Sequence, residues 1–244
     1  LPEVEAAAPT IQTFGLININ NRKTMGVQVM GYPIERIVKV NDFGHSLYRQ
    51  FNQPIEDAED KHLPSKEVDA IRQQMDKKVP SFNLLPDIDY RAEFKWINPR
   101  ANPNLIKESA NWPGMIGGIG VFNIHKDATG KLEGRDDFLY RLPVKLTVLG
   151  VSATGNFDVG GKAERNFWLV DTSRTKVWQY DSNTVYIPFD VLQKDLGMDE
   201  QQAEQDGKQI TIPARTSELH VRVRKPWRDS SEGLIAVRNK VQSI

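Results

Sequence analysis

The stretch VWQYDSNTVYIPFDVLQKDLGM, residues 177–198, carries the clearest structural signal of the chain. Its second half places four strand-forming residues, TVYI at 184–187, directly before a proline and a run of apolar residues at helical spacing. Gly197 then provides the residue type that most often follows the end of a helix. This order predicts a strand that runs straight into a short helix. The aromatic and acidic first half, residues 178–183, has no such local explanation.

The composition limits the class of protein. At 244 residues, the chain is long enough for one large domain or two small ones with a substantial hydrophobic core. Its 32 Lys and Arg residues balance its 32 Asp and Glu residues, so no global field attracts nucleic acid or an anionic membrane. The absence of cysteine excludes disulfides, thiolate zinc sites and a cysteine nucleophile. The most apolar window, residues 113–124, is too short and too rich in glycine for a membrane span.

Both ends of the chain predict strand and helix. After a remnant of helix at the N-terminus, alternating apolar residues over 11–29 predict a hairpin with a polar turn at 20–23. Residues 218–224 predict a strand with Leu219, Val221 and Val223 facing inward.

The closing segment predicts a helix that Asp229 or Ser230 begins. Its apolar stripe consists of Leu234, Val237, Val241 and Ile244, and no glycine, asparagine or proline follows to end it. We therefore expect both ends of the chain to be cut from a longer polypeptide. The alternative is a natural C-terminus that frays.

The middle of the chain is rich in loops. One helix, residues 66–77, interrupts the segment from 43 to 113, and residues 201–208 predict a polar surface connection. Two strands are expected at 144–149 and 166–170.

The connection between those two strands, residues 150–165, is long for a hairpin loop, which usually has about two to five residues. Long ordered loops on a sheet are often functional.

Motifs for catalysis are missing from the sequence. The four histidines are scattered, which gives no helix-borne zinc site, and Asp87 with Asp89 lacks the remainder of a calcium loop. The segment 155–162 resembles a phosphate loop but has Asn156 in place of the first glycine and Ala163 in place of the magnesium-binding hydroxyl residue. The sequence therefore favours a binding or mechanical module over an enzyme.

Five segments in chain order resemble the extracytoplasmic domain of MacB/FtsX-type ABC transporter permeases. They are LPEVEAAAPTIQTFGLININNRKTMGVQVMGYP (1–33), WPGMIGGIG (112–120), the strand, loop and strand at 144–170, YDSNTVYIPFDVLQKDLGM (180–198), and SELHVRVRKP (217–226) followed by a helix. The resemblance covers the chain from end to end. The chain departs from the family at 43–112, which is longer than usual, and at 121–143, where a different run replaces the family's pattern.

The resemblance implies an α+β fold of two lobes, a MacB-like periplasmic core domain. Residues 1–40 and 210–244 would form a membrane-proximal, porter-like α/β lobe, and residues 41–209 an inserted, mostly β, sabre-like distal lobe. Residues 178–183 would be the entrance to the strand and brace the 150–165 loop. The domain would lie on the periplasmic side of the bacterial inner membrane.

The resemblance also implies a non-catalytic role, with no cofactor or metal in this chain. A separate cytoplasmic ABC ATPase subunit or domain would hydrolyse ATP, and the domain would couple that reaction to efflux, lipoprotein release or mechanotransmission. The other expected partners are a periplasmic adaptor or lipoprotein chaperone and a second permease in a homodimer or heterodimer. Nucleic acid is not expected as a partner.

In lipoprotein-releasing relatives, the loop that looks equivalent to residues 150–165 recruits a chaperone. This implies a partner-binding site at the tip of the loop, with Phe157 as an apolar anchor. The expected contact residues are Ser152, Thr154, Gly155, Asn156, Phe157, Asp158, Val159 and Gly160. The alternative for Phe157 is packing onto its own lobe.

Two other classes of function stay open at this point. One is a soluble glycan-binding or hydrolytic protein with a site built from Trp168, Trp178 and Tyr180. The other is a structural module that holds two permease halves together.

Overall fold

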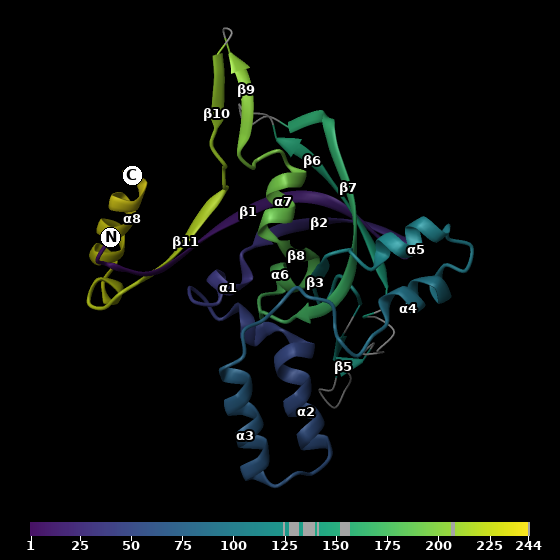
Figure 1. Ribbon diagram of the computed structural model, residues 1–244. Coiled ribbons are helices and arrows are strands. Elements are labelled where there is room, and N and C mark those ends of the chain that lie inside the picture. Colours follow the sequence, from purple (N-terminus) through teal and green to yellow (C-terminus); the bar gives the residue numbers. More distant parts are fainter. Residues whose placement is uncertain are drawn as a thin grey trace.

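Figure 1 shows the computed structural model of the chain, which mixes helices and strands as an α+β protein. It describes residues 1–123, 125–126, 132–133, 140, 142–151, 157–205 and 208–243. The predicted α+β class is therefore confirmed. None of the helices in these ranges combines the length and the apolar character that crossing a membrane requires.

A barrel-like sheet of six strands forms the centre of the molecule. In spatial order the strands are β1 (Val4–Ile19), β2 (Lys23–Tyr32), β8 (Thr184–Pro188), β3 (Gly114–Gly118), β7 (Phe157–Ser173) and β6 (Pro143–Val151). The sheet closes because the second half of β1 also pairs with β6, from Gly15 opposite Val148 to Ile19 opposite Val144. Closure leaves few unpaired backbone groups at strand edges.

The first half of β1 has a different partner, β11 (Glu218–Val223), which extends the sheet beyond the barrel. Two predictions are corrected here. The N-terminal segment is strand from Val4 onward, because it pairs with β11, and Leu219 does not face inward but is 49% exposed. Strands from both predicted lobes share this one sheet, and the division at 1–40, 41–209 and 210–244 stays a prediction.

Alternate residues of the barrel strands point inward and form the first hydrophobic core, as the two-residue period of a strand requires. Its members include Ile17, Ile19, Val27, Val29, Leu146, Val148, Phe167, Leu169, Val185 and Ile187. Helix α7 (Phe189–Asp195) follows β8 directly and adds Leu192 to this core. The predicted strand-helix unit is thus confirmed, including Gly197, which has a φ of +65° just after the helix.

Outward-facing residues of β2, β8, β3 and β7 form a second core with the segment between β2 and β3. That segment contains α1 (Ile34–Ile37), a 3-10 turn (Phe43–Ser46), a π-helical turn (Tyr48–Asn52), α2 (Gln53–Asp60), α3 (Ser65–Asp76), α4 (Tyr90–Ile97) and α5 (Pro103–Ser109). The predicted helix at 66–77 is α3. Helices α2 and α3 project away from the barrel, whereas α4 and α5 lie at its side (Figure 1).

A buried carboxylate ties this helical segment to the barrel. Asp171 of β7 accepts hydrogen bonds from the backbone N–H groups of Arg49 (2.7 Å), Gln50 (3.0 Å) and Thr172 (2.7 Å), and from Nε2 of Gln50 (3.0 Å). The amide of Gln50 also exchanges two hydrogen bonds with the backbone of Ser81. Burial raises the pKa of Asp171 to about 6, although the four hydrogen bonds act in the opposite direction.

Three further segments differ from their predictions. The long loop at 150–165 is mostly strand, because β6 and β7 stay paired as far as Val151 opposite Phe157. The polar connection at 201–208 belongs to a hairpin of β9 (Gln201–Gln205) and β10 (Lys208–Ile212). Residues 178–183 form a short helix, α6 (Trp178–Asn183), rather than the entrance to a strand. A separate small pair consists of β4 (His125–Lys126) and β5 (Leu132–Glu133).

The closing helix α8 (Ser231–Gln242) confirms the last predicted element. Ser230 caps it by accepting a hydrogen bond from Gly233 N at 3.0 Å. Of the predicted stripe, Val237 is buried and Leu234 is 43% exposed, while Ile244 lies outside the described residues. Lys240 on this helix contacts the carboxylate of Glu3, so α8 and the start of β1 lie side by side.

Candidate functional site

The predicted partner-binding residues follow β6 in the chain, and the last four of them begin β7. Ser152, Thr154, Gly155 and Asn156 fall outside the described residues. The backbone of Phe157, Asp158, Val159 and Gly160 forms the first residues of β7, with Phe157 opposite Val151 and Asp158 opposite Gly150. A register shift between Leu149 and Gly150 separates this outer part from the regular pairing below it. The described part of the predicted site is therefore the outer end of a paired strand, in an arm formed by β6 and β7, and not part of a long loop.

Ion pairs hold the base of this arm. Glu164 of β7 pairs with Lys145 across the strands and with Lys162 on its own strand. Hydrogen bonds from these two ammonium groups lower the pKa of Glu164 to about 2. Arg165 donates from Nε to Asp195 of α7 at 2.8 Å, which joins the arm to the helix that follows β8.

The aromatic residues of the sequence motif do not brace this arm. Helix α6 packs against β2, β3 and β8, next to the C-terminal end of β7 at Ser173. Phe157 begins the same strand, and a 17-residue strand is about 50 Å long at ~3.3 Å per residue. The aromatics and Phe157 thus lie at opposite ends of β7, and the prediction that residues 178–183 brace the 150–165 loop is wrong, because α6 packs against β2, β3 and β8.

The structure also separates the three residues expected for a glycan or hydrolase site. Trp168 is completely buried, and its Nε1 donates to the carbonyl of Ser109 at 2.7 Å. Trp178 is 80% exposed and Tyr180 is 41% exposed. Because a buried indole presents no ring face to a sugar, these three side chains do not form one binding surface.

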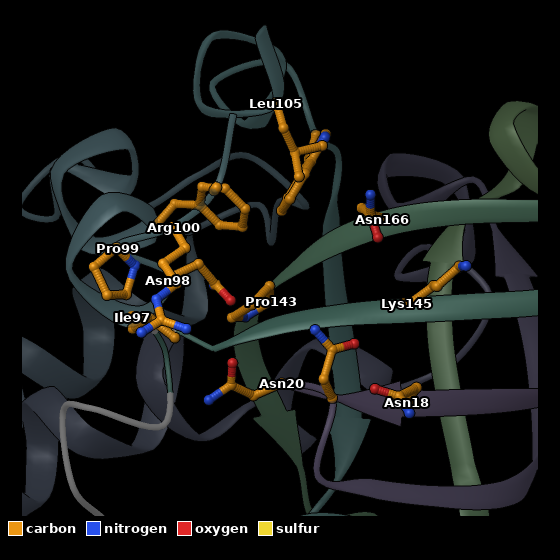
Figure 2. A pocket seen from close by; sticks show the side chains of 14 residues that line it. Asn18, Asn20, Ile97, Asn98, Pro99, Arg100, Leu105, Pro143, Lys145 and Asn166 are labelled. Atoms are coloured by element: carbon orange, nitrogen blue, oxygen red, sulfur yellow. The ribbon is translucent and has the colours of Figure 1, made fainter. Parts of the chain in front are cut away.

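A pocket of about 470 Å³ lies where α4 and α5 meet the end of the barrel, a volume within the usual range for small-molecule sites. Figure 2 shows Asn20 from the β1–β2 turn and Asn98 from the end of α4 on either side of Pro143. Five asparagines line the pocket in all: Asn18, Asn20, Asn21, Asn98 and Asn166.

The chemistry of this asparagine pocket suits neutral polar groups. Each amide can both donate and accept hydrogen bonds, and Trp112 adds an aromatic surface. The lining contains the cations Arg100 and Lys145 and no carboxylate, although Lys145 is paired with Glu164. Sequence reasoning missed this pocket because its residues come from separate segments. In the sequence, the only feature that these residues share is that many of them are asparagines.

The candidate motifs for catalysis weighed in the sequence can be located in the described part of the chain. No group of three or more His, Asp or Glu side chains there could hold a metal ion. The segment that resembled a phosphate loop runs along β7 from Phe157 onward and does not open a helix. His220 contacts Glu218 of the same strand, β11, at 3.2 Å.

A comparison of the chain with protein-family models gives no match, and a search of curated proteins also gives none.

Proposed function

We propose that this chain is the extracytoplasmic domain of a MacB/FtsX-type ABC transporter permease. It would lie on the periplasmic side of a bacterial inner membrane and couple ATP hydrolysis by a separate cytoplasmic ATPase to the handling of a substrate or a partner protein. The chain itself would be non-catalytic. Its partner contact would be the tip of the β6–β7 arm, residues 152–160.

One observation carries this proposal. The five segments with family resemblance are adjacent in space, because they supply β1, β2, β3, β6, β7, β8 and β11 of a single sheet. The two segments that depart from the family, 43–112 and 121–143, lie between these strands in the chain. A shared sheet with insertions between its strands is the pattern expected when an ancestral fold keeps its core and changes its connections.

The arrangement of the outer strand pair supports the same proposal. Arg224 N donates to the carbonyl of Glu3 at 2.8 Å, and Lys240 contacts the Glu3 carboxylate. The start of β1 and the end of the chain therefore lie next to each other, as Figure 1 shows. A domain inserted between two membrane helices requires this closeness of its first and last segments.

The class of protein is tested on the full-length protein in the cells that make it. Spheroplasts should allow an external protease to digest this domain, and the protein purified from detergent-solubilised membranes should bring an ABC ATPase with it. Two results together would refute the proposal: digestion of the domain only after the inner membrane is permeabilised, and a purified preparation without ATPase activity.

The contact site is tested by Phe157→Ala in the same full-length protein. We expect the loss of transport or partner capture with an unchanged melting temperature of the domain. Phe14→Ala is the matched control, since Phe14 is 67% exposed on β1. A large fall in melting temperature for Phe157→Ala with full partner capture would show that Phe157 packs onto its own domain instead.

A further inference from the structure

A second pocket, of about 380 Å³, lies beside the C-terminal end of β7. Its walls are Tyr32 at the end of β2, Tyr186 in the middle of β8, the turn at residues 41–46, and the segment at 174–180 that leads into α6. Neither the arm nor the asparagine pocket includes these residues. The lining includes Val177 and Tyr180 from the first half of the 177–198 motif, for which the sequence offered no local explanation.

The inner wall of this pocket is aromatic. The rings of Tyr32, Phe43 and Tyr186 pack with centroid distances of 4.6–5.1 Å, and all three side chains are buried. Burial raises the pKa of Tyr32 to about 12, so its hydroxyl keeps its proton at neutral pH and can donate a hydrogen bond. Within the described residues, that hydroxyl has no hydrogen-bond partner.

Two cations line the same pocket. Arg174 is partly buried, and its guanidinium makes no hydrogen bond or ion pair with the described residues. Lys176 is exposed and likewise makes no such contact through its side chain. The lining has one carboxylate, Asp42, and one imidazole, His45. A partly buried guanidinium gains most from a carboxylate or phosphate, which it can bind through two parallel hydrogen bonds.

The outer rim is apolar and fixed in place. Val177 is 48% exposed and Tyr180 41%, and both line the pocket, while Trp178, between them in the chain and 80% exposed, is not part of the lining. Asp181 holds them there, because its carboxylate accepts hydrogen bonds from the backbone N–H groups of Thr175 (2.7 Å) and Lys176 (3.1 Å). Clusters of exposed apolar residues often mark ligand-binding grooves or interaction surfaces.

We infer that this pocket binds an amphipathic monocarboxylate, with its carboxylate on Arg174 and the Tyr32 hydroxyl and its apolar part against Tyr180 and Val177. A neutral amphiphile would leave Arg174 without a partner, and a dianion would meet Asp42. The inference goes beyond the proposed function and depends only on the pocket, so it stands whether or not the chain is a permease domain.

The test is a calorimetric titration of the 244-residue protein with N-acetyl-leucyl-phenylalanine and with the same compound as its C-terminal amide. The free carboxylate should bind with a Kd on the order of 10–100 µM, a usual range for ligands of a few tens of non-hydrogen atoms. The amide should bind at least ~10-fold more weakly, because a hydrogen bond to a charged group is lost. Equal affinities for the two compounds, or no binding of either, would overturn the inference.

Variants locate the binding site. Arg174→Gln should weaken binding of the carboxylate by at least ~10-fold and leave binding of the amide unchanged. Tyr32→Phe should weaken binding of the carboxylate by ~3-fold or more. Arg238→Gln is the matched control on α8, where Arg238 contacts only its neighbour Asn239 among the described residues. If Arg174→Gln lowers the melting temperature, the affinity of the Lys176→Gln variant for the carboxylate tests the pocket independently. Unchanged affinity in both Arg174→Gln and Lys176→Gln would exclude this pocket.

Discussion

The substitution Asp171→Asn tests how the helical segment is held to the barrel. It preserves the shape of the side chain and replaces one acceptor oxygen by an NH2 group. In one orientation this group faces the N–H groups of Arg49 and Thr172, and in the other it faces both N–H groups of Gln50. The Gln50 amide cannot turn to compensate, because both its ends are bonded to Ser81.

The magnitude follows from two opposing effects. Two buried donors without an acceptor cost ~1–3 kcal/mol each. Against this, the neutral amide avoids the burial of a charge. In the wild type, that burial raises the pKa of Asp171 from 3.8 to about 6, and this pKa shift corresponds to about 3 kcal/mol. At pH 7.5 the two effects largely offset each other, and we expect Asp171→Asn to lower the free energy of unfolding by about 1 kcal/mol.

The pH dependence gives the sharper result. Between pH 3.8 and about 6, the folded protein holds a proton on Asp171 that the unfolded chain has lost, so the wild type gains stability as the pH falls. This contribution is complete below pH 3.8 and disappears as the pH rises through about 6. The variant has no such group. Its deficit relative to the wild type should therefore be about 2 kcal/mol larger at pH 4.5 than at pH 7.5.

The measurement is denaturant unfolding of both proteins at these two pH values. All other titrating groups are shared, so they cancel in the difference between the proteins. Asp76→Asn, at an exposed position at the end of α3, is the control and should differ from the wild type by less than ~0.5 kcal/mol at both pH values. A deficit of Asp171→Asn that is the same at pH 4.5 and 7.5 would refute the reasoning.

Two further substitutions test the packing of the second core. Gly114→Ala would put a Cβ 2.1 Å from the carbonyl oxygen of Phe82, so we expect a loss of about 1–3 kcal/mol in denaturant unfolding. Gly26→Ala, which meets no atom within 4 Å, should be near neutral, and equal effects of the two would contradict this account. Trp168→Phe removes a buried N–H and part of the ring and should cost ~2–4 kcal/mol by the same assay. Trp178→Phe, at an exposed site, should cost less than ~0.5 kcal/mol, and a larger loss there than for Trp168→Phe would be inconsistent with the assigned burial.

Local patterns in the sequence were sufficient to predict those helices and strands that short-range signals determine. The strand and helix at 184–196 carry their signals within themselves, and so does α3. The start of β1 contrasts with these elements. Its alanines favour a helix, but residues Ala6 to Ala8 pair with β11, which is more than 200 positions away in the chain. Such pairing is invisible in a local window.

The two strands of the arm were predicted too short for a related reason. Glycines at 155, 160 and 161 together with polar residues predicted a loop, because that part of the hairpin lacks an alternating apolar pattern. Backbone pairing with β6 nevertheless continues along it. Helix α6 was missed because it is only six residues long and is held by the Asp181 hydrogen bonds rather than by helical periodicity.

The pockets could not be derived from the sequence either. Each collects residues from segments that only the closed sheet and its helical insertion bring together. The sequence did single out the aromatic residues at 178–180 as unusual, and of these Tyr180 lines the second pocket.

The double pairing of β1 has a mechanical consequence. This strand is 16 residues long, about 50 Å, and it runs without interruption from its contact with β11 and α8 into the wall of the barrel. A pull on its first residues, directed along the strand, would load its hydrogen bonds with β2 and β6 together, in shear. Strand β11, by contrast, is bonded to β1 along one edge only and could be peeled away one hydrogen bond at a time. The molecule is thus stiff toward tension on β1 and more compliant toward tension on β11, although the start of β1 and the end of β11 lie side by side.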